Sequence, residues 1–341
     1  MNEKYQVSVS PHVRDSITTR KIMLYVIAAL LPACVFGILN FGLHALLILT
    51  ITPAAAVVSE YVYEKLLHKP VTTGDCSAVL TGLLLAMNMP PEIDWWIPVV
   101  GAVFAIVIIK QLYGGLGQNF MNPALGARCF LLIAFSSQMT TYAASRGFIH
   151  TVWNVPATTD ALSGATPLAY LKLGEHFDLQ ALFLGNVGGV IGETSALCLL
   201  IGGLFLVFMK IIEIRIPAVY LGSFAALTLI TAGVRGYSDP VIFMLEELCA
   251  GGIMLGAWFM ATDYVTSPIM PKGQYIYALL LGFLTWVFRM IGNSAEGVSY
   301  AIIFMNCLVP MIDNYSRPLA FGIRKEKKTK GKTNGKEAAE A

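Results

Sequence analysis

The sequence predicts an all-α polytopic membrane protein, and three observations support this fold class. Of the 341 residues, 56% are hydrophobic and 13% are charged, and the mean hydropathy is +0.67, a composition outside the range of soluble globular domains. The apolar residues are collected in about ten runs, most of them near the length that crosses a bilayer as a helix.

The six cysteines and five histidines occur singly, so no spacing typical of a metal site is present.

The apolar runs are expected to be the membrane spans, since a helix of roughly 20 residues crosses the hydrocarbon core. The third and fifth runs are short for a span. In chain order the runs cover residues 22–40, 43–64, 77–90, 95–112, 122–136, 186–209, 216–234, 241–261, 274–290 and 297–313.

Basic residues gather at alternate ends of these runs, and the positive-inside rule places those ends in the cytoplasm. They are Arg14, Arg20, Lys21, Lys65, Lys69, Lys110, Lys210, Arg215, Lys272 and the lysines of the tail. We therefore expect both termini to be cytoplasmic. The first run has the length of a span and no small-residue cleavage site before it, so we expect an uncleaved helix in the cytoplasmic (inner) membrane.

The expected organisation is two halves of five helices each. A cytoplasmic segment covers 1–21, the first half 22–136, an extracytoplasmic loop 137–185, the second half 186–313 and a basic cytoplasmic tail 314–341. The net charge of +2 owes much to this tail, and nothing indicates a nucleic acid partner.

Two pairs of segments suggest that the halves are repeats. "GLLLAMNMPP", from Gly82, is similar to "GAWFMATDYVTSP", from Gly256, and "NFMNPALGA" is similar to "IIFMNCLVPMID". Five spans per half would make the repeats inverted, an arrangement that places a binding site or pathway between them. Chance similarity between short glycine-rich helices is the alternative explanation.

The long loop contains an exposed turn of small residues, "DALSGATPL". Gly164 and Ala165 leave the backbone unobstructed, Pro167 stops a helix from starting earlier, and Ser163 and Thr166 offer hydroxyl groups. Such a turn is accessible to a modifying enzyme. An ordinary extracytoplasmic loop is the alternative.

"DALSGAT" resembles the flavinylation motif Asp-x-x-Ser-Gly-Ala-Thr of membrane subunits in the Rnf and Nqr respiratory complexes. The resemblance implies that Thr166 holds covalent FMN through a phosphoester bond. It implies that Ser163, Gly164 and Ala165 form the recognition turn, and that a flavin transferase also reads Asp160. In those families the modification is made outside the cytoplasm, where the charge pattern places this loop.

The resemblance extends over nearly the whole chain and, within the NqrB/RnfD family, favours the RnfD branch of the Rnf complexes over NqrB. It is carried by "SPHVRD", "RKIMLYVIAALLPA", "GDCSAVLTGLLLAMNMPP", "GQNFMNPALGARCF" and "GAWFMATDYVTSP". Only 21 residues precede the first run, whereas NqrB usually has a longer amino-terminal region. The implied partners are the other membrane and peripheral subunits of an Rnf complex, among them a second FMN-bearing subunit.

A second group of candidate residues lies in "GGLGQNFMNPALGAR". Asn119 and Asn122 are three residues apart, so on a helical turn their amides face the same way and suit the edge of an isoalloxazine ring. In the Nqr relatives the matching asparagines contact a non-covalent riboflavin, so the resemblance implies the same here. Capping of a helix by Asn122 before Pro123 is the alternative, and the two roles are compatible.

Ionisable residues within or beside the spans form a third group, since burying charge in hydrocarbon is costly. Asp75 and Asp263 are the ion-path candidates, because they mark the corresponding third and eighth spans. Salt bridges or solvation at helix ends would explain most of the group. Its other members are Arg128, Glu193, Glu246, Glu247 and Asp313.

Together these features predict a membrane subunit of an ion-translocating oxidoreductase that relays electrons through flavin while the complex moves Na+ or H+. The chain has no glycine-rich dinucleotide fingerprint after a strand and no iron-sulfur cysteine run, which favours a relay over a docking role. The alternatives are the quinone-linked Nqr counterpart and, in another class, a flavin-free channel or transporter with inverted repeats.

Overall fold

The computed structural model describes residues 17–142, 166–172, 176–237, 239–292 and 297–318, and these residues form helices and loops without a strand. The first half contains α1 (Thr19–Phe41), α2 (Leu43–Leu66), η1 (Thr73–Asp75), α3 (Ser77–Met87), α4 (Trp96–Val103), η2 (Phe104–Gln111), α5 (Pro123–Ala134) and α6 (Ser136–Met139). Here η1 is a 3₁₀ turn and η2 is a π-helix that continues α4. The all-helical prediction is confirmed for the described residues.

Two short helices, α7 (Pro167–Lys172) and α8 (Leu179–Leu184), lie in the segment 137–185 that was expected to be a loop. The second half contains α9 (Ala196–Phe208), α10 (Arg215–Arg235), α11 (Pro240–Cys249), α12 (Ile253–Leu255), η3 (Gly256–Met260), α13 (Pro271–Met290) and α14 (Val298–Ser316). Like η2, the segment η3 is π-helical.

Each apolar run contains helix, but two runs differ from the expected continuous spans. Residues 186–195, expected at the start of the sixth span, form a loop, so Glu193 lies before α9 and not inside a helix. The backbone N–H groups of Ile191 and Gly192 in this loop donate to the carbonyls of Met89 and Met87. The eighth run is broken between α11 and α12, and the two parts are bent by 66°.

By length and composition, α1, α2 and α10 are each able to cross a membrane, and the bent pair of α11 with α12 and η3 would make a fourth span. The apolar helices α3, α5 and α9, and α4 with η2, are shorter. The chain is therefore a multi-pass membrane protein.

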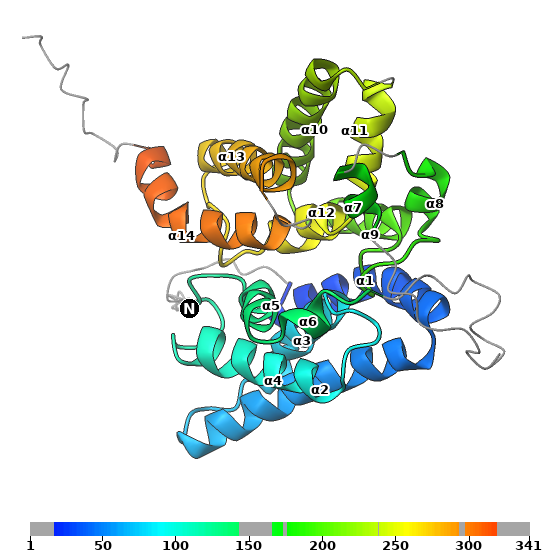
Figure 1. Ribbon diagram of the computed structural model, residues 1–341. Helices are drawn as coiled ribbons and strands as arrows, with labels where there is room; N and C mark the ends of the chain where they lie inside the picture. The colour runs from blue at the N-terminus through cyan, green and yellow to red at the C-terminus, as the bar shows by residue number, and fades with distance from the viewer. Residues whose placement is uncertain (1–16, 143–165, 173–175, 238, 293–296, 319–341) are drawn as a thin grey trace, which may run out of the picture.

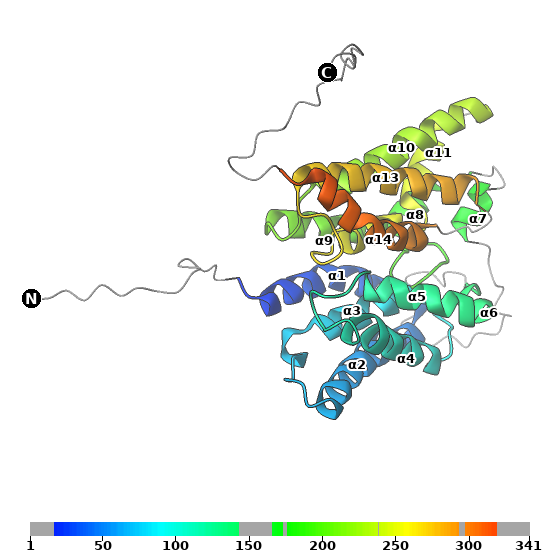
Figure 2. The ribbon, with the colours of Figure 1, turned by 90° about the vertical axis from the view of Figure 1, so that its left-hand side faces the viewer.

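The helices form two layers that match the order of the chain (Figure 1). In the first layer α2 packs on α3 and α4, and in the second α10 packs on α11 and α13. The layers meet where α1 packs on α9 and α5 packs on α14, as Figure 2 also shows.

Small residues allow the two layers to approach closely. Gly202 of α9 faces the backbone of Ala29 in α1, and a Cβ atom at this glycine would overlap the Ala29 carbonyl oxygen. Within the first layer, Gly42, with a φ of 87°, forms the tight turn between α1 and α2. Close contact through glycine is how helices gain packing energy in a membrane, where burial of apolar surface contributes little.

Candidate functional site

The larger cavity, of about 80 Å³, lies between the two layers at the end of the bundle where α1 begins. Its wall includes Ile22 near the start of α1, Ser77 at the start of α3 and Ile211 just after α9. The side chain of Leu116, which also lines the cavity, is 40% exposed. The cavity is therefore lined by both halves and borders the surface.

Both asparagines singled out from the sequence line this cavity. They lie in the loop before α5, so the expected helical turn is absent, but both side chains are buried. The Asn122 side chain caps α5 by accepting from the N–H groups of Ala124 (3.1 Å) and Leu125 (3.4 Å). The Nδ2 of the same residue donates to the Met260 carbonyl at 3.5 Å. Capping of α5 by Asn122 is thus confirmed. The capping side chain still lies at the cavity wall.

Two buried polar atoms at the cavity lack a hydrogen-bond partner among the described residues. They are Oδ1 of Asn119, an acceptor, and Nε1 of Trp258, a donor on the π-helical η3. Both residues line the cavity. A buried polar atom without a partner costs about 1–3 kcal/mol, so a ligand with both donor and acceptor atoms would be stabilised there.

Asp263 lines the same cavity, in the loop between η3 and α13. Its carboxylate accepts from Thr266 Oγ1 at 3.0 Å and from the Val265 N–H at 3.4 Å. Desolvation raises the pKa of Asp263, while these two hydrogen bonds act in the opposite direction.

Asp75 lies beside the cavity and does not line it. Its Oδ1 accepts from the N–H (2.8 Å) and the Oγ (2.6 Å) of Ser77, and Ser77 belongs to the cavity wall. The two ion-path candidates therefore approach one cavity from different halves.

A smaller cavity, of about 20 Å³, includes Thr166 in its wall. Thr166 precedes α7, and its carbonyl accepts from the N–H groups of Ala169 (2.8 Å) and Tyr170 (3.3 Å). Val187, also in this wall, accepts from Asn40 near the end of α1. This cavity is therefore at the opposite end of α1 from the larger one, as the position of α7 in Figure 2 illustrates.

The remaining residues of the sequence motif, Asp160, Ser163, Gly164 and Ala165, lie outside the described residues. Their predicted role in recognition stays a prediction.

Buried polar groups connect the two cavities. Glu193 lines the smaller cavity and pairs with Arg128 of α5 (Oε1 to Nη1, 3.0 Å). The same Nη1 donates to Asn88 Oδ1 (2.6 Å) and to Ser299 Oγ (3.1 Å). Asn88 Nδ2 approaches the Met260 sulfur at 3.9 Å, and the Met260 carbonyl is the acceptor for Asn122.

The two similar asparagine segments noted in the sequence also meet at this connection. With the Asn306 amide oriented so that its donors and acceptors are satisfied, its oxygen accepts from the Asn122 N–H at 3.2 Å. The nitrogen of this amide faces the Tyr277 hydroxyl and the Thr266 carbonyl, to which it can donate. The matching asparagines of the two halves are therefore in direct contact.

The sequence pattern did not single out Trp258, Glu60 or Lys110 as site residues. The pair Glu60 and Glu64, four residues apart in an otherwise apolar helix, was the available signal, because charge is costly within a span. Trp258 gave no signal, since an aromatic residue in an apolar run is ordinary.

Fold and cavities together define a multi-pass helical membrane protein with a candidate ligand cavity at each end of its bundle and buried polar groups between them. The comparison with family models is more specific. The NQR2, RnfD, RnfE family model matches residues 6–322, and the chain belongs to this family. The resemblance inferred from the motifs is thus confirmed.

The relatives are similar over nearly their whole lengths. The D-type subunit of the Na+-translocating ferredoxin:NAD+ oxidoreductase complex of Acetobacterium woodii is 47% identical over 334 residues, covering 96% of this chain and 99% of that protein. The corresponding subunit of the proton-translocating ferredoxin:NAD+ oxidoreductase complex of Clostridium ljungdahlii is 43% identical over 334 residues, covering 94% and 97%. The corresponding subunit of an ion-translocating oxidoreductase complex of Stutzerimonas stutzeri is 43% identical, covering 91% and 93%.

Proposed function

We propose that this chain is the D-type membrane subunit of an ion-translocating ferredoxin:NAD+ oxidoreductase. It relays electrons between a covalent FMN on Thr166 and a riboflavin in the larger cavity, while the complex moves Na+ or H+. The relatives named above support the type of complex. The observation that carries the relay is the pair of cavities at opposite ends of α1, each lined by a residue of a proposed flavin site.

The proposed topology has ten spans in two inverted halves, with both termini in the cytoplasm and the flavin-bearing loop outside. The order of packing supports it, since the two layers repeat one pattern. In the first layer α2 contacts α3 and α4, and in the second α10 contacts α11 and α13. The contact between Asn122 and Asn306 supports it as well. The larger cavity then lies at the cytoplasmic end and Thr166 at the opposite end.

For FMN, the chain supplies position and a tether. Thr166 is half-buried beside Gly188 and Gly189, where small residues leave room near the anchor. Glu193 is in the same wall, held by Arg128. FMN supplies one- and two-electron redox chemistry when attached, and the protein fixes its location and polarity. The motif residues before Thr166 would be read by a flavin transferase.

The unpaired donor and acceptor in the larger cavity fit the hydrogen-bonding groups of riboflavin. The isoalloxazine edge carries both acceptors and donors, which match Trp258 Nε1 and Asn119 Oδ1. The cavity borders the surface near Leu116, which is 40% exposed, so a ligand has access to these groups. Asn122, Trp258 and Asn119 would orient it.

For ions, Asp75 and Asp263 are proposed as path residues at the cytoplasmic end. Asp263 lines the riboflavin cavity and Asp75 is one hydrogen bond away from it, through Ser77. Negative charge on a cofactor in the cavity would act on both carboxylates.

The covalent flavin is tested on a denaturing gel. The chain is co-expressed with a flavin transferase and viewed under ultraviolet light. We expect a fluorescent band that is lost in Thr166→Ala and kept in Thr159→Ala, a matched threonine outside the motif. Absence of any band would favour the flavin-free transporter, and a band that persists in Thr166→Ala would move the attachment site.

The type of complex is tested in membranes containing the assembled subunits. Reduction of NAD+ by reduced ferredoxin is expected. Activity restricted to NADH and quinone would instead favour the quinone-linked Nqr complex.

A further inference from the structure

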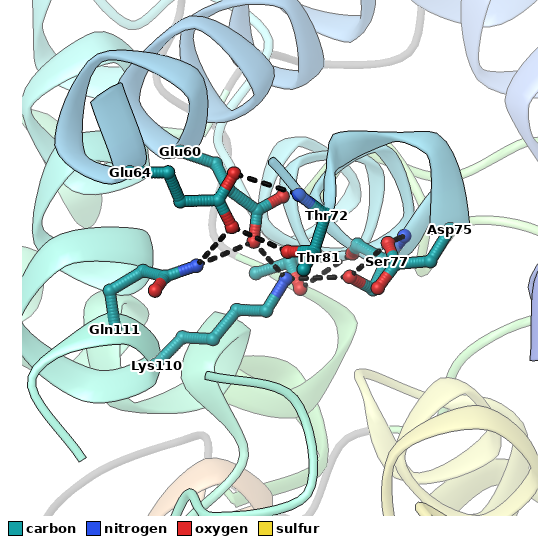
Figure 3. Close-up of polar contacts among 8 residues, drawn as sticks. All are labelled: Glu60, Glu64, Thr72, Asp75, Ser77, Thr81, Lys110 and Gln111. Atoms are coloured by element: carbon teal, nitrogen blue, oxygen red, sulfur yellow. Dashed lines mark hydrogen bonds and ion pairs between the residues drawn. The ribbon is translucent and has the colours of Figure 1, made fainter. Parts of the chain in front are cut away.

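A group of charged and polar side chains, most of them buried, surrounds Lys110 next to the larger cavity (Figure 3). We call it the Lys110 cluster; it consists of Glu60, Glu64, Thr72, Asp75, Ser77, Thr81, Lys110 and Gln111. The Lys110 ammonium lies 2.6 Å from both Glu60 Oε1 and Ser77 Oγ. Gln111 Nε2 donates to Glu60 Oε1 at 2.9 Å and to Glu64 Oε1 at 3.3 Å.

Local structure brings these side chains together. Glu60 and Glu64 are one turn apart on α2, so they share a face. Lys110 and Gln111 are consecutive residues, yet both side chains are buried, at 2% and 3% exposed. They end the π-helix η2, whose wider turn departs from the usual helical spacing. Such π-helical turns are frequent at functional sites.

The cluster holds more negative than positive charge. Glu60 is fully buried and Glu64 is 2% exposed, and Asp75 adds a third carboxylate through its hydrogen bond to Ser77. Lys110 is the only cation in the described cluster. In addition, Glu60 Oε2 is buried without a hydrogen-bond partner among the described residues. A buried carboxylate with an unused oxygen is expensive unless a cation can approach it.

The ammonium of Lys110 occupies a place suited to a monovalent metal ion. Its neighbours are a carboxylate oxygen and a hydroxyl oxygen, which are the ligand types of hard cations. The free Oε2 of Glu60 would supply a further oxygen. We call these oxygens of Glu60 and Ser77 the cage. The lysine side chain within it acts as a covalently attached substitute for a mobile cation.

The cluster reaches in two directions. Lys110 and Ser77 line the larger cavity, so the ammonium is within reach of charge placed there. In the other direction, Glu64 accepts from the N–H of Thr72 at 3.0 Å and from its hydroxyl. Thr72 is exposed. The cage around Lys110 therefore lies between the surface and the cavity.

We propose that Lys110 is a built-in cation that fills a monovalent-cation site formed by the oxygens of Glu60 and Ser77, while Gln111 holds Glu60 in place by donating to it. Negative charge that arrives in the larger cavity draws the ammonium toward it, and Na+ or H+ then enters the site from the surface by way of Glu64 and Thr72. Charge balances in this step: one electron enters the cavity, one cation enters the cage, and Lys110 keeps its proton. The electron step rests on the proposed function, whereas the cation site does not.

The site is tested without flavin or turnover, by thermal unfolding of the purified full chain at low and high NaCl, with choline chloride keeping the ionic strength constant. Lys110→Met empties the cage, so Na+ should stabilise this variant more than it stabilises the wild type, by roughly 2–4 °C. Adding Glu60→Gln should abolish that extra response. Lys69→Met removes an exposed lysine near the same end of α2 and should behave like the wild type.

A proton in place of Na+ would give a different pattern. Lys110→Met would then be stabilised by acid and not by NaCl, and Glu60→Gln would again remove the effect. The other titratable groups facing the site are Glu64, Asp75 and Tyr63, whose hydroxyl lies 3.4 Å from the Gln111 carbonyl. Glu64→Gln in the same background should leave the acid response in place, which assigns it to Glu60.

An equal response of Lys110→Met and wild type to both NaCl and acid would overturn the proposal. If Lys110→Met does not accumulate, Lys110→Gln is measured in the same way under the same criterion. In the assembled complex, Lys110→Met should keep electron transfer and lose most ion transport per electron. Loss of the flavin band on the gel would contradict the proposed function and leave the cation response intact, so the two failures are distinguishable.

Discussion

The buried ion pair between Arg128 and Glu193 gives a sharp test of the tertiary arrangement. These side chains are 4% exposed each, and the Nη1 to Oε1 distance is 3.0 Å. Arg128→Met would leave the Glu193 carboxylate in an apolar interior without this cation, which costs about 3–5 kcal/mol in the free energy of unfolding. The Asn88 oxygen, held by Arg128 at 2.6 Å, would also lose this donor.

Neutralising both partners should recover part of the loss. In the double variant Arg128→Met with Glu193→Gln no charge is left buried at this place, so the two effects should be non-additive by about 1–3 kcal/mol. The assay is equilibrium unfolding of the purified chain in mixed micelles. The pair Arg215 and Glu213 serves as control, because its distance is also 3.0 Å while its side chains are 38% and 55% exposed.

The control substitution Arg215→Met should change stability by about 0–1 kcal/mol, since exposed ion pairs contribute little. A cost of Arg128→Met no larger than that of this control would contradict a buried ion pair at this position. Strict additivity of the single and double variants would contradict it equally, because residues that touch in a buried pair must couple.

Three further predictions concern packing, capping and pH. Gly202→Ala should destabilise by about 1–3 kcal/mol, because its Cβ would overlap the Ala29 backbone, whereas Gly222→Ala, with open space around it, should stabilise slightly in the same unfolding assay. Asn122→Ala should cost about 1 kcal/mol by removing the cap of α5; Asn122→Ser should keep that stability and still lower the retention of non-covalent flavin, measured by fluorescence after extraction. Burial raises the pKa of Asp263, so stability should fall as pH rises from the unfolded-state pKa through the folded-state pKa, and Asp263→Asn should remove this fall in a pH series of melting curves.

Much of the helical structure was predictable because apolar run length alone indicates it. The expected spans 22–40 and 216–234 correspond to α1 and α10 within a few residues. The sixth and eighth runs were less well predicted. Residues 186–195 are apolar enough to suggest a span, yet the N–H groups of Ile191 and Gly192 bond to carbonyls at and just after the end of α3, a contact that no local pattern encodes.

The candidate site was predicted in parts. Asn119, Asn122 and Asp263 came from separate segments of the sequence, and the structure places all three on one cavity wall. In the sequence, Lys110 served only as one of the basic residues that indicate the cytoplasmic side. Its role in the cluster depends on the turn of η2, which carries it toward Glu60 of a different helix.

The sequence by itself determined the class of protein, the family and the identity of Thr166 as the candidate anchor, because these depend on composition and on motifs that are continuous in the chain. Only the tertiary structure decided which polar residues meet. Burial forces charged and amide groups to find partners, and the available partners come from distant segments, as Glu193 does for Arg128 and Glu60 for Lys110. The physical reason is that the membrane interior offers no water, so each buried polar group is satisfied by whatever the packing of helices brings within reach.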